Sequence, residues 1–369
     1  MDNNRLKNIS SLNSIRAITA LIIVIYHSKF ILWCGGNEYI AKIGLNHWLD
    51  YPLLALDLLS SNGEPIVVCF FILSGFVITH SFRKSNYSMI QFYAIRLIRI
   101  YIPFIFSIIL SISILVLVHW LNPIIFENSI REYNSRLLVA WNNLNLISTI
   151  KTFFFIKNQE YIGLNFVYWS LLHEVIFYLI YPIYDRIKTK GRIALIIALT
   201  GFYTLFQNHL MYYQIFFLIG ILIYDKFSEK DSKPIFNNRK LYILILPVLY
   251  LIMTINFIMH WKTGADITAA ILSIFAFDFV ISYKSKWSGI ANYFAEFSYT
   301  LYLVHLPILL LTYCLLVLFT NQVVFYERYF YYSGVIIAVL GAKMLFFSEK
   351  FSLFLIKKLK ENFKTKSTK

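Results

Sequence analysis

The sequence predicts an all-helical, polytopic membrane protein with about ten transmembrane helices and both termini in the cytoplasm. The first observation behind this fold class is composition: 59% of the residues are hydrophobic, only 14% are charged, and the mean hydropathy is +0.63. Soluble domains are less apolar and carry about 25% charged residues. The second observation is that long apolar runs alternate with loops of unequal lysine and arginine content.

The apolar runs define the expected spans, because a transmembrane helix needs about 20 residues. Each run is bounded by charged or turn residues, and the runs lie near residues 15–33, 65–82, 99–121, 165–186, 193–208, 211–227, 241–259, 267–283, 294–319 and 329–348. They divide the chain into a cytoplasmic N-terminal segment (1–14), a membrane domain (15–350) and a basic cytoplasmic tail (351–369).

Lysine and arginine gather in every second loop. The opposite short loops hold little beyond Lys42, Lys262 and Arg328. Basic loops stay in the cytoplasm, so this asymmetry predicts an even number of crossings. The same rule accounts for the net charge of +15, and no nucleic-acid partner is expected. The loops rich in basic residues contain, among others, Arg83, Lys84, Arg186, Lys188 and Arg192.

The longest segment on the expected outer side is about 122–164. The preference of lysine- and arginine-rich loops for the cytoplasm applies only weakly to a loop of this length. Aromatic faces beside polar groups are one way to hold a sugar, but aromatic residues also crowd membrane interfaces, and we expect the interface here. The aromatic residues in question are Tyr133, Trp141, Phe153, Phe154, Phe155 and Tyr161.

The three cysteines give no sign of a metal site or a disulfide framework. Cys34, Cys69 and Cys314 lie in or beside apolar runs, with neither a CxxC pair nor the ligand spacing of a zinc site. We expect them to be small core residues.

The first expected span, SIRAITALIIVIYHSKF at 14–30, carries two ionisable residues on one face. Arg16 and His27 are eleven residues apart, which is about three helical turns and about 16 Å. An ionisable group inside a membrane is costly unless it lines a cavity or meets a partner. His27 is therefore either a functional residue or a structural histidine bonded to a neighbouring helix.

The second span, NGEPIVVCFFILSGFVITH, places Ser74 and Gly75 well inside the membrane. Such a small pair lets another helix or a ligand approach the backbone closely. The following run, FYAIRLIRIYIP, has Arg96 and Arg99 on one helical face at the cytoplasmic surface. Paired arginines there bind either lipid headgroups or the phosphates of a soluble nucleotide-like donor.

The fourth and ninth spans add further polar residues. VYWSLLHEVIFYLIYP puts Glu174 near mid-membrane with Ser170 one turn away, while the neighbouring His173 points elsewhere by about 100°. A buried carboxylate needs a partner or must become neutral. In AEFSYTLYLVHLPIL, three side chains at i, i+4 and i+7 form one polar stripe, namely Ser298, Tyr302 and His305.

Four spans thus deliver polar side chains to comparable depths, namely His27, Ser74, Glu174 and His305. Scattered structural residues would not readily produce this coincidence. It indicates an intramembrane site for a reaction or for transport.

The chain resembles the acyltransferase family 3 proteins, which are polytopic membrane enzymes that transfer acyl groups, commonly acetyl, to carbohydrates and related acceptors. The resemblance runs from about residue 10 to 350, with its motifs in family order. The matching stretches are Arg16 with His27, GEPIVVCFFILSGFVIT at 63–79, RLIRIYIP at 96–103, YWSLLHEVIFYLIYP at 168–182 and SYTLYLVHLPI at 298–308.

The resemblance implies that Arg16 and His27 are the essential pair, with Ser74, Arg96, Arg99, Trp169, Glu174 and His305 in support. His173 departs from the family pattern, which usually has a small or aliphatic residue before the glutamate. Many relatives carry a soluble hydrolase-like domain after the last span. This sequence stops at Lys369, so we expect the membrane domain to reach its acceptor itself or through a separate protein.

The expected activity is transfer of an acyl group, above all acetyl, from cytoplasmic acyl-coenzyme A to a hydroxyl of a cell-envelope polysaccharide or glycolipid. The protein would lie in the inner (cytoplasmic) membrane, with acyl-coenzyme A as donor substrate and no tightly bound cofactor. His27 is the candidate base, oriented by Glu174 or His305. The catalytic candidates are His27, Arg16 and Glu174, and the donor-binding candidates are Arg96, Arg99, Ser74 and His305.

Two other functions remain open from the sequence. A transporter, flippase or polymerase of lipid-linked sugars is also polytopic, with intramembrane charges. It would be favoured by inverted repeats and by broken helices in matching halves, neither of which the sequence displays. A non-catalytic sensor or scaffold would differ in not binding coenzyme A.

Overall fold

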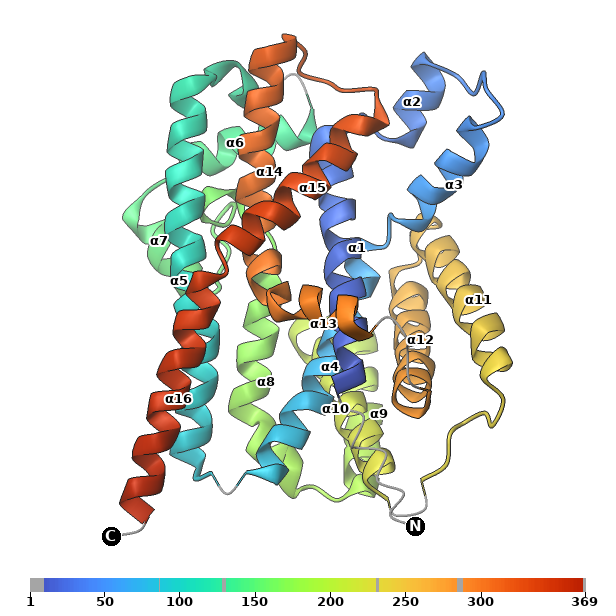
Figure 1. Ribbon diagram of the computed structural model, residues 1–369, viewed down its shortest axis with the longest axis vertical. Coiled ribbons are helices and arrows are strands. Elements are labelled where there is room, and N and C mark those ends of the chain that lie inside the picture. The colour runs from blue at the N-terminus through green and yellow to red at the C-terminus, as the bar shows by residue number, and fades with distance from the viewer. Residues whose placement is uncertain (1–9, 86, 128–130, 230–231, 284–287, 368–369) are drawn as a thin grey trace. The chain divides into compact units, whose positions relative to one another are not determined.

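The computed structural model describes residues 10–85, 87–127, 131–229, 232–283 and 288–367. Within these ranges every regular element is a helix (Figure 1). The helices are α1 (Asn13–Leu32), α2 (Gly36–Lys42), α3 (Asp50–Leu59), α4 (Gly63–Lys84), α5 (Met89–Leu121), η2 (Pro123–Phe126), α6 (Glu132–Asn142), α7 (Leu146–Phe153), η3 (Ile162–Leu164), α8 (Tyr168–Arg186), α9 (Thr189–Phe206), α10 (His209–Ser228), α11 (Arg239–Ile258), α12 (Lys262–Ser282), α13 (Ser288–Glu296), α14 (Ser298–Thr320), α15 (Arg328–Met344) and α16 (Phe347–Ser367).

The predicted fold class, an all-helical polytopic membrane protein, is confirmed. Eight helical stretches among the described residues are long and apolar enough to cross a membrane. They are Ser10–Leu32, Gly63–Lys84, Met89–Leu121, His209–Ser228, Arg239–Ile258, Lys262–Ser282, Ser298–Thr320 and Arg328–Phe363. The side of the membrane on which the termini lie stays a prediction from the loop charges.

The two other expected spans, 165–186 and 193–208, coincide with α8 and α9, which are more polar. α8 contains Glu174, Asp185 and Arg186 in 19 residues, and α9 has Lys190 and Arg192 in its first turn. Helices of 19 and 18 residues are about 27–29 Å long, close to the thickness of the hydrocarbon core. The length of α8 and α9 therefore fits a membrane span. Their charged residues make them less apolar than the other eight helical stretches.

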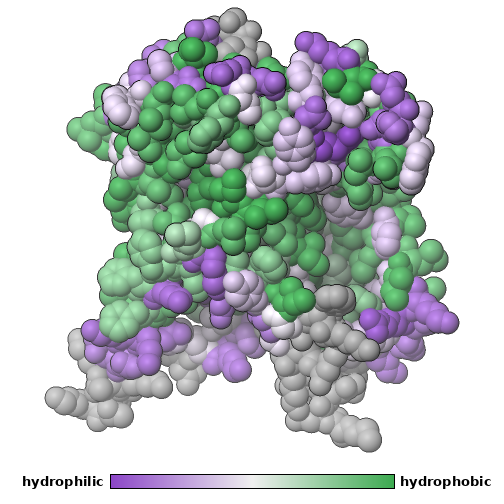
Figure 2. Space-filling model, turned by 45° about the horizontal axis from the view of Figure 1, so that its top comes forward, coloured by the Kyte–Doolittle hydropathy of each residue, from purple (hydrophilic) through white to green (hydrophobic). Residues whose placement is uncertain are grey.

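Large apolar side chains cover much of the surface. Leu205 is 77% exposed, Phe319 is 83% exposed and Leu340 is 60% exposed. Figure 2 shows broad continuous areas of hydrophobic residues on the face in view. Apolar surface of this extent is unfavourable in water and is what a lipid-facing helix presents.

The described residues form two compact units. The first comprises residues 10–21, 62–85, 87–93, 173–229, 232–283 and 288–296, and the second comprises residues 22–61, 94–127, 131–172 and 297–367. The helices α1, α5 and α8 each contribute to both units. Each unit has its own packing and its own cluster of polar side chains.

In the first unit, α10 packs against both α9 and α4, and α12 packs against both α4 and α11 (Figure 1). The closest approach is between α4 and α10. A Cβ atom at Gly75 would lie 2.2 Å from the carbonyl oxygen of Phe217, and one at Gly220 would lie 2.2 Å from that of Ile72. The small residue after Ser74 therefore serves helix packing, one of the two uses expected for it.

Replacing Gly220 by alanine should destabilise this crossing by roughly 1–3 kcal/mol, because the new methyl group meets backbone atoms that must move apart. The matched control is Gly201→Ala on α9, where nothing lies within 4 Å of the added Cβ. That change should be neutral or should stabilise the helix by up to about 1 kcal/mol. Thermal unfolding in detergent compares the two variants, and equal melting temperatures would contradict the close packing of α4 on α10.

In the second unit, α14 packs against α15, η3 and α16. The part of α1 after Leu21 packs on α15, where a Cβ atom at Gly334 would lie 2.3 Å from the Leu32 side chain. The hydroxyl of Ser28 donates a hydrogen bond of 2.7 Å to the Tyr331 carbonyl. These contacts fix the portion of α1 that carries His27.

A buried ion pair secures the same end of α1 to α3 and α15. Asp57, 3% exposed, accepts from Arg328 at 2.7 Å and from the Tyr331 hydroxyl at 2.5 Å. Lys29 donates to the hydroxyls of Ser60 and Ser61 at 3.0 and 2.9 Å. Because buried charges need partners, Lys29 and Arg328 are assigned to this structural network.

The described residues of the segment 122–164 are folded, with η2, α6, α7 and η3 packed together. Asn134 is fully buried, and its amide donates to the Ile125 carbonyl at 2.6 Å and to the Tyr313 hydroxyl at 3.0 Å. Tyr133 and Phe155 are buried inside the unit, whereas Phe154 is 56% exposed. Protein packing, which the sequence did not suggest, therefore accounts for part of the aromatic content of this segment.

Candidate active site

The centre of the second unit is a pair of buried histidines from α1 and α14. Nδ1 of His27 lies 2.8 Å from Nε2 of His305, and the planes of the two rings are nearly parallel, with an angle of 9° between them. His27 is 9% exposed and His305 is fully buried. The two mid-helix histidines that the sequence singled out are thus direct partners.

The hydrogen bonds determine which nitrogen of each ring carries the proton. Nδ1 of His305 lies 2.9 Å from the carbonyl oxygen of Leu301. A carbonyl oxygen only accepts, so His305 carries its proton on Nδ1, and in the neutral ring Nε2 is an acceptor. Nδ1 of His27 must then be the donor to His305. The neutral His27 ring is left with an unprotonated Nε2, for which the structure gives no partner among the described residues.

The polar stripe predicted on the ninth span borders the pair. Tyr302 and Ser170 share a hydrogen bond of 2.6 Å, and the Tyr302 hydroxyl also donates to the Val167 carbonyl at 3.2 Å. Ser298, the third member of the stripe, is 3% exposed. The stripe therefore connects α14 with the start of α8 beside the histidines.

A second hydrogen-bond network lies next to this stripe, and the sequence did not indicate it. The amide of Asn165 donates to the hydroxyls of Ser107 and Ser111 at 3.3 and 3.2 Å and to the Leu303 carbonyl at 2.8 Å. Tyr168 shares a 2.7 Å hydrogen bond with Ser107. The network connects α5, α8 and α14. Its contact on α14, Leu303, is two residues before His305.

The first unit holds the other predicted pair. The hydroxyl of Ser74 on α4 donates to Oε1 of Glu174 on α8 at 3.2 Å, and the Tyr178 hydroxyl donates to the same oxygen. Glu174 is therefore held from two sides. Tyr178 is one helical turn after Glu174, which is the signal that could have identified it.

His173 points away from this carboxylate, as its position on the helix predicted. Its ring packs edge-on against Tyr213 and Phe71, with centroid distances of 4.7 and 5.9 Å. The side chain is 7% exposed. The unusual residue before the glutamate thus serves aromatic packing within the first unit.

The arginines predicted to bind the donor occupy two helices. Arg16 lies in the first turn of α1, and Arg96 and Arg99 lie on α5. Arg96 is buried, with 6% exposure, and Arg99 is half-buried. Trp169, also half-buried, is the second residue of α8. Their role in donor binding stays a prediction.

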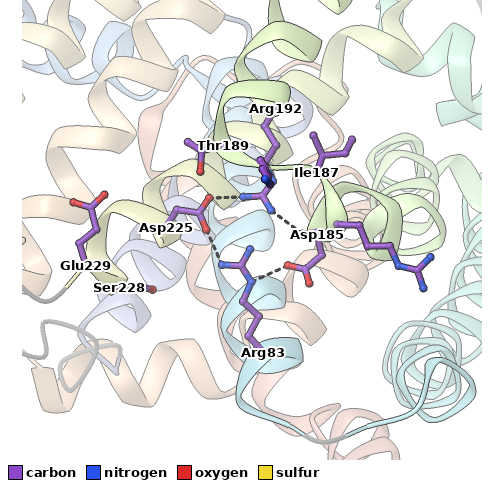
Figure 3. Close-up of a pocket in the computed structure, with 10 residues that line it drawn as sticks. Arg83, Asp185, Ile187, Thr189, Arg192, Asp225, Ser228 and Glu229 are labelled. Carbon is purple, nitrogen blue, oxygen red and sulfur yellow. Dashed lines mark hydrogen bonds and ion pairs between the residues drawn. The ribbon is translucent and has the colours of Figure 1, made fainter.

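An open pocket of about 490 Å³ lies where four helix ends of the first unit meet (Figure 3). These are the ends of α4, α8 and α10 and the start of α9, all assigned to the cytoplasmic side by the loop charges. The pocket is lined by Arg83, Asp185, Arg186, Ile187, Lys188, Thr189, Arg192, Asp225, Ser228 and Glu229.

Most of the charge in this pocket is neutralised within it. Arg83 reaches Asp185 at 2.7 Å and Asp225 at 2.6 Å, and Arg192 pairs with Asp225 from the other side (Figure 3). Arg192 also donates to the Tyr184 carbonyl at 2.9 Å. We therefore infer that Arg83 and Arg192 connect the helix ends and have a structural role.

The comparison with known families identifies the chain. A family model described as an acyltransferase domain matches residues 9–347 of the 369. The chain belongs to acyltransferase family 3. No curated protein and no solved structure matches it. The family assignment favours an enzyme over the transporter and the scaffold that the sequence left open.

The histidine pair gives this membrane acyltransferase the means for acid–base chemistry. Acyl transfer to a hydroxyl requires removal of the hydroxyl proton, and an imidazole with a free nitrogen and a fixed tautomer is suited to this step. His305 is hydrogen-bonded to His27, an arrangement like that of the base and its orienting group in other acyl-transfer sites. The geometry thus singles out Nε2 of His27.

Proposed function

We propose that this acyltransferase is an O-acetyltransferase of the inner membrane. It moves an acetyl group from cytoplasmic acetyl-coenzyme A to a hydroxyl of a cell-envelope polysaccharide or glycolipid on the outer side. Acetyl-coenzyme A is a substrate and not a resident cofactor. The observation that carries the proposal is the hydrogen-bonded series from the Leu301 carbonyl through His305 to His27, which leaves one imidazole nitrogen free as a base.

The reaction then needs only this nitrogen and the two substrates. Nε2 of His27 takes the proton of the acceptor hydroxyl, and the oxygen attacks the thioester carbonyl. The carbon–sulfur bond breaks, and the coenzyme leaves as a thiolate. His27 returns the proton to this thiolate, so the products are an ester and coenzyme A, and the base is regenerated.

The remaining predicted residues complete the proposal. His305 holds the His27 ring, and Arg16 receives the donor at the inner end of α1. Glu174, held by Ser74 and Tyr178, supplies a fixed carboxylate in the first unit. Arg96 and Arg99 provide charge for the coenzyme phosphates.

Transfer of radiolabelled acetyl from acetyl-coenzyme A to the endogenous glycan tests this function. Membranes that contain the protein should label the glycan, and membranes without it should not. Release of the label by mild alkali would identify an ester. Absence of any transfer, with the protein present and folded, would contradict the proposed function.

Reversing both Arg96 and Arg99 to glutamate should weaken coenzyme A binding by at least about tenfold, because attraction to the phosphates becomes repulsion. Asparagine at either position should weaken binding less, since charge is removed without being reversed. Calorimetry on detergent-purified protein measures the affinity.

The matched control reverses Arg186 and Lys188, which are exposed cations on the same expected side of the membrane. The charge change is identical, so a general effect of net charge would appear in both double variants. Equal affinity of the Arg96/Arg99 variant and the wild type would mean that these arginines face lipid headgroups.

A further inference from the structure

Arg136 on α6 is held in place by a carboxylate, and its Nη1 has no hydrogen-bond partner among the residues that the structure describes. Its Nε and Nη2 donate to the two oxygens of Glu160 at 2.8 and 3.1 Å. A side-on pair of this kind fixes the plane of the guanidinium and leaves the two N–H groups of Nη1 pointing away from Glu160. The Arg136 side chain is 26% exposed, whereas that of Glu160 is 8% exposed.

Only one aromatic ring separates this guanidinium from His27. Arg136 lies over the ring of Phe166 at 4.7 Å from its centroid. The same ring packs edge-on against His27, with centroids 5.0 Å apart, and contacts Phe30 one turn further along α1.

Arg136 lies toward the C-terminal end of α1. Arg131, at the start of α6, donates to the carbonyls of Phe30 and Trp33 at 2.9 and 2.7 Å, so the first residues of this segment cap that helix end. Under the proposed function, the acceptor enters from this end. An acceptor that approaches His27 from this end comes near Arg136, since both side chains contact the Phe166 ring.

The cluster of Arg136, Lys157 and Glu160 has a positive net charge. Arg136 and Lys157 both pair with Glu160, so two cations share one carboxylate and the net charge is +1. An arginine fork with two free N–H groups matches the paired oxygens of a carboxylate or a phosphate. A neutral sugar hydroxyl would use this geometry poorly.

We propose that Arg136 binds an anionic group, a carboxylate or a phosphate, on the acceptor sugar and so selects acidic acceptors whose hydroxyl reaches His27. Arg136 is a specificity-determining residue in this scheme, and Glu160 and Phe166 are its positioning residues. The proposal rests on the proposed function, because the direction from which the acceptor enters is part of that function.

Binding of small sugars to the detergent-purified full-length chain tests the proposal without requiring turnover. The probes are methyl glucoside, glucuronate and glucose 1-phosphate, with dissociation constants measured by ligand-observed NMR. In the wild type, at least one anionic probe should bind about tenfold more tightly than methyl glucoside. Tighter binding of glucuronate identifies a carboxylate as the natural group, and tighter binding of glucose 1-phosphate identifies a phosphate.

Arg136→Gln should abolish this preference, and Arg136→Lys should retain part of it, since lysine keeps the charge and loses the fork. The matched control is Lys151→Gln, which removes a cation of the same segment that binds Asn158 and should leave the preference unchanged. The proposal is wrong if the wild type shows no preference or if Arg136→Gln keeps it.

The glycan-labelling assay separates this proposal from the proposed function. Labelling by the wild type without any preference for anionic probes would overturn the role of Arg136 alone. A preference for anionic probes without labelling would overturn the acetyltransferase function and leave the anion site standing. A fall in turnover that is equal for all acceptors, with the binding preference intact, would assign Arg136 to the reaction and not to selection.

Discussion

Replacing His27 by alanine should lower the rate of acyl transfer by about 10²–10⁴-fold, the range that a general base contributes. Nε2 of His27 is the nitrogen left without a proton by the hydrogen bonds around it. Without this ring, the acceptor hydroxyl keeps its proton, and the neutral oxygen is a poor nucleophile. Labelling of the surface glycan measures the loss, with expression and membrane insertion of the variant as accompanying measurements.

The two replacements of His305 distinguish the orienting role from simple packing. A glutamine at this position offers a carbonyl oxygen that can accept from Nδ1 of His27 and keep the proton there, whereas an alanine offers none. His305→Gln should therefore retain more activity than His305→Ala.

Two outcomes would contradict these expectations. Near-normal acylation by His27→Ala would eliminate His27 as the base. Equal activity of the two His305 variants would eliminate the proposed control of the His27 tautomer by His305.

The membrane-spanning helices were predictable because hydrophobic length alone specifies a transmembrane helix. The boundaries of α1 and α4 follow their apolar runs to within a few residues. The folding of the segment 122–164 was not predictable in the same way. Its helices α6 and α7 have only 11 and 8 residues, and their positions depend on buried contacts such as the one between Asn134 and Tyr313.

The residues of the candidate site were predictable one by one, because an ionisable or polar group inside an apolar run stands out against its neighbours. Their partners were predicted only as alternatives: either Glu174 or His305 was expected to orient His27, and the structure pairs His27 with His305. Nothing in the spacing of His27 and His305 states that Nδ1 of one meets Nε2 of the other, since the two are 278 residues apart. Tyr178 could not be told apart from the many other aromatic residues of the chain. Arg136 did not stand out because it lies in a long outer segment.

Acetyl-coenzyme A should support transfer only from the cytoplasmic face of the membrane, and an acceptor that cannot cross the membrane should be acylated only from the outer face. His27 is eleven residues after Arg16 on α1 and six residues before Trp33. At 1.5 Å per residue these separations are about 16 Å and about 9 Å along a helix. A donor anchored at the inner end and an acceptor entering from the outer end can therefore meet at His27.

Sealed vesicles of known orientation measure this directly. With the cytoplasmic face outward, added acetyl-coenzyme A should label an acceptor trapped inside, and with the opposite orientation it should not. Opening the vesicles with detergent should restore transfer in both preparations, which controls for inactive protein. Efficient transfer with both substrates confined to the cytoplasmic side would contradict the arrangement. It would place acylation before export of the glycan, and the acceptor would then reach His27 from the same side as the donor.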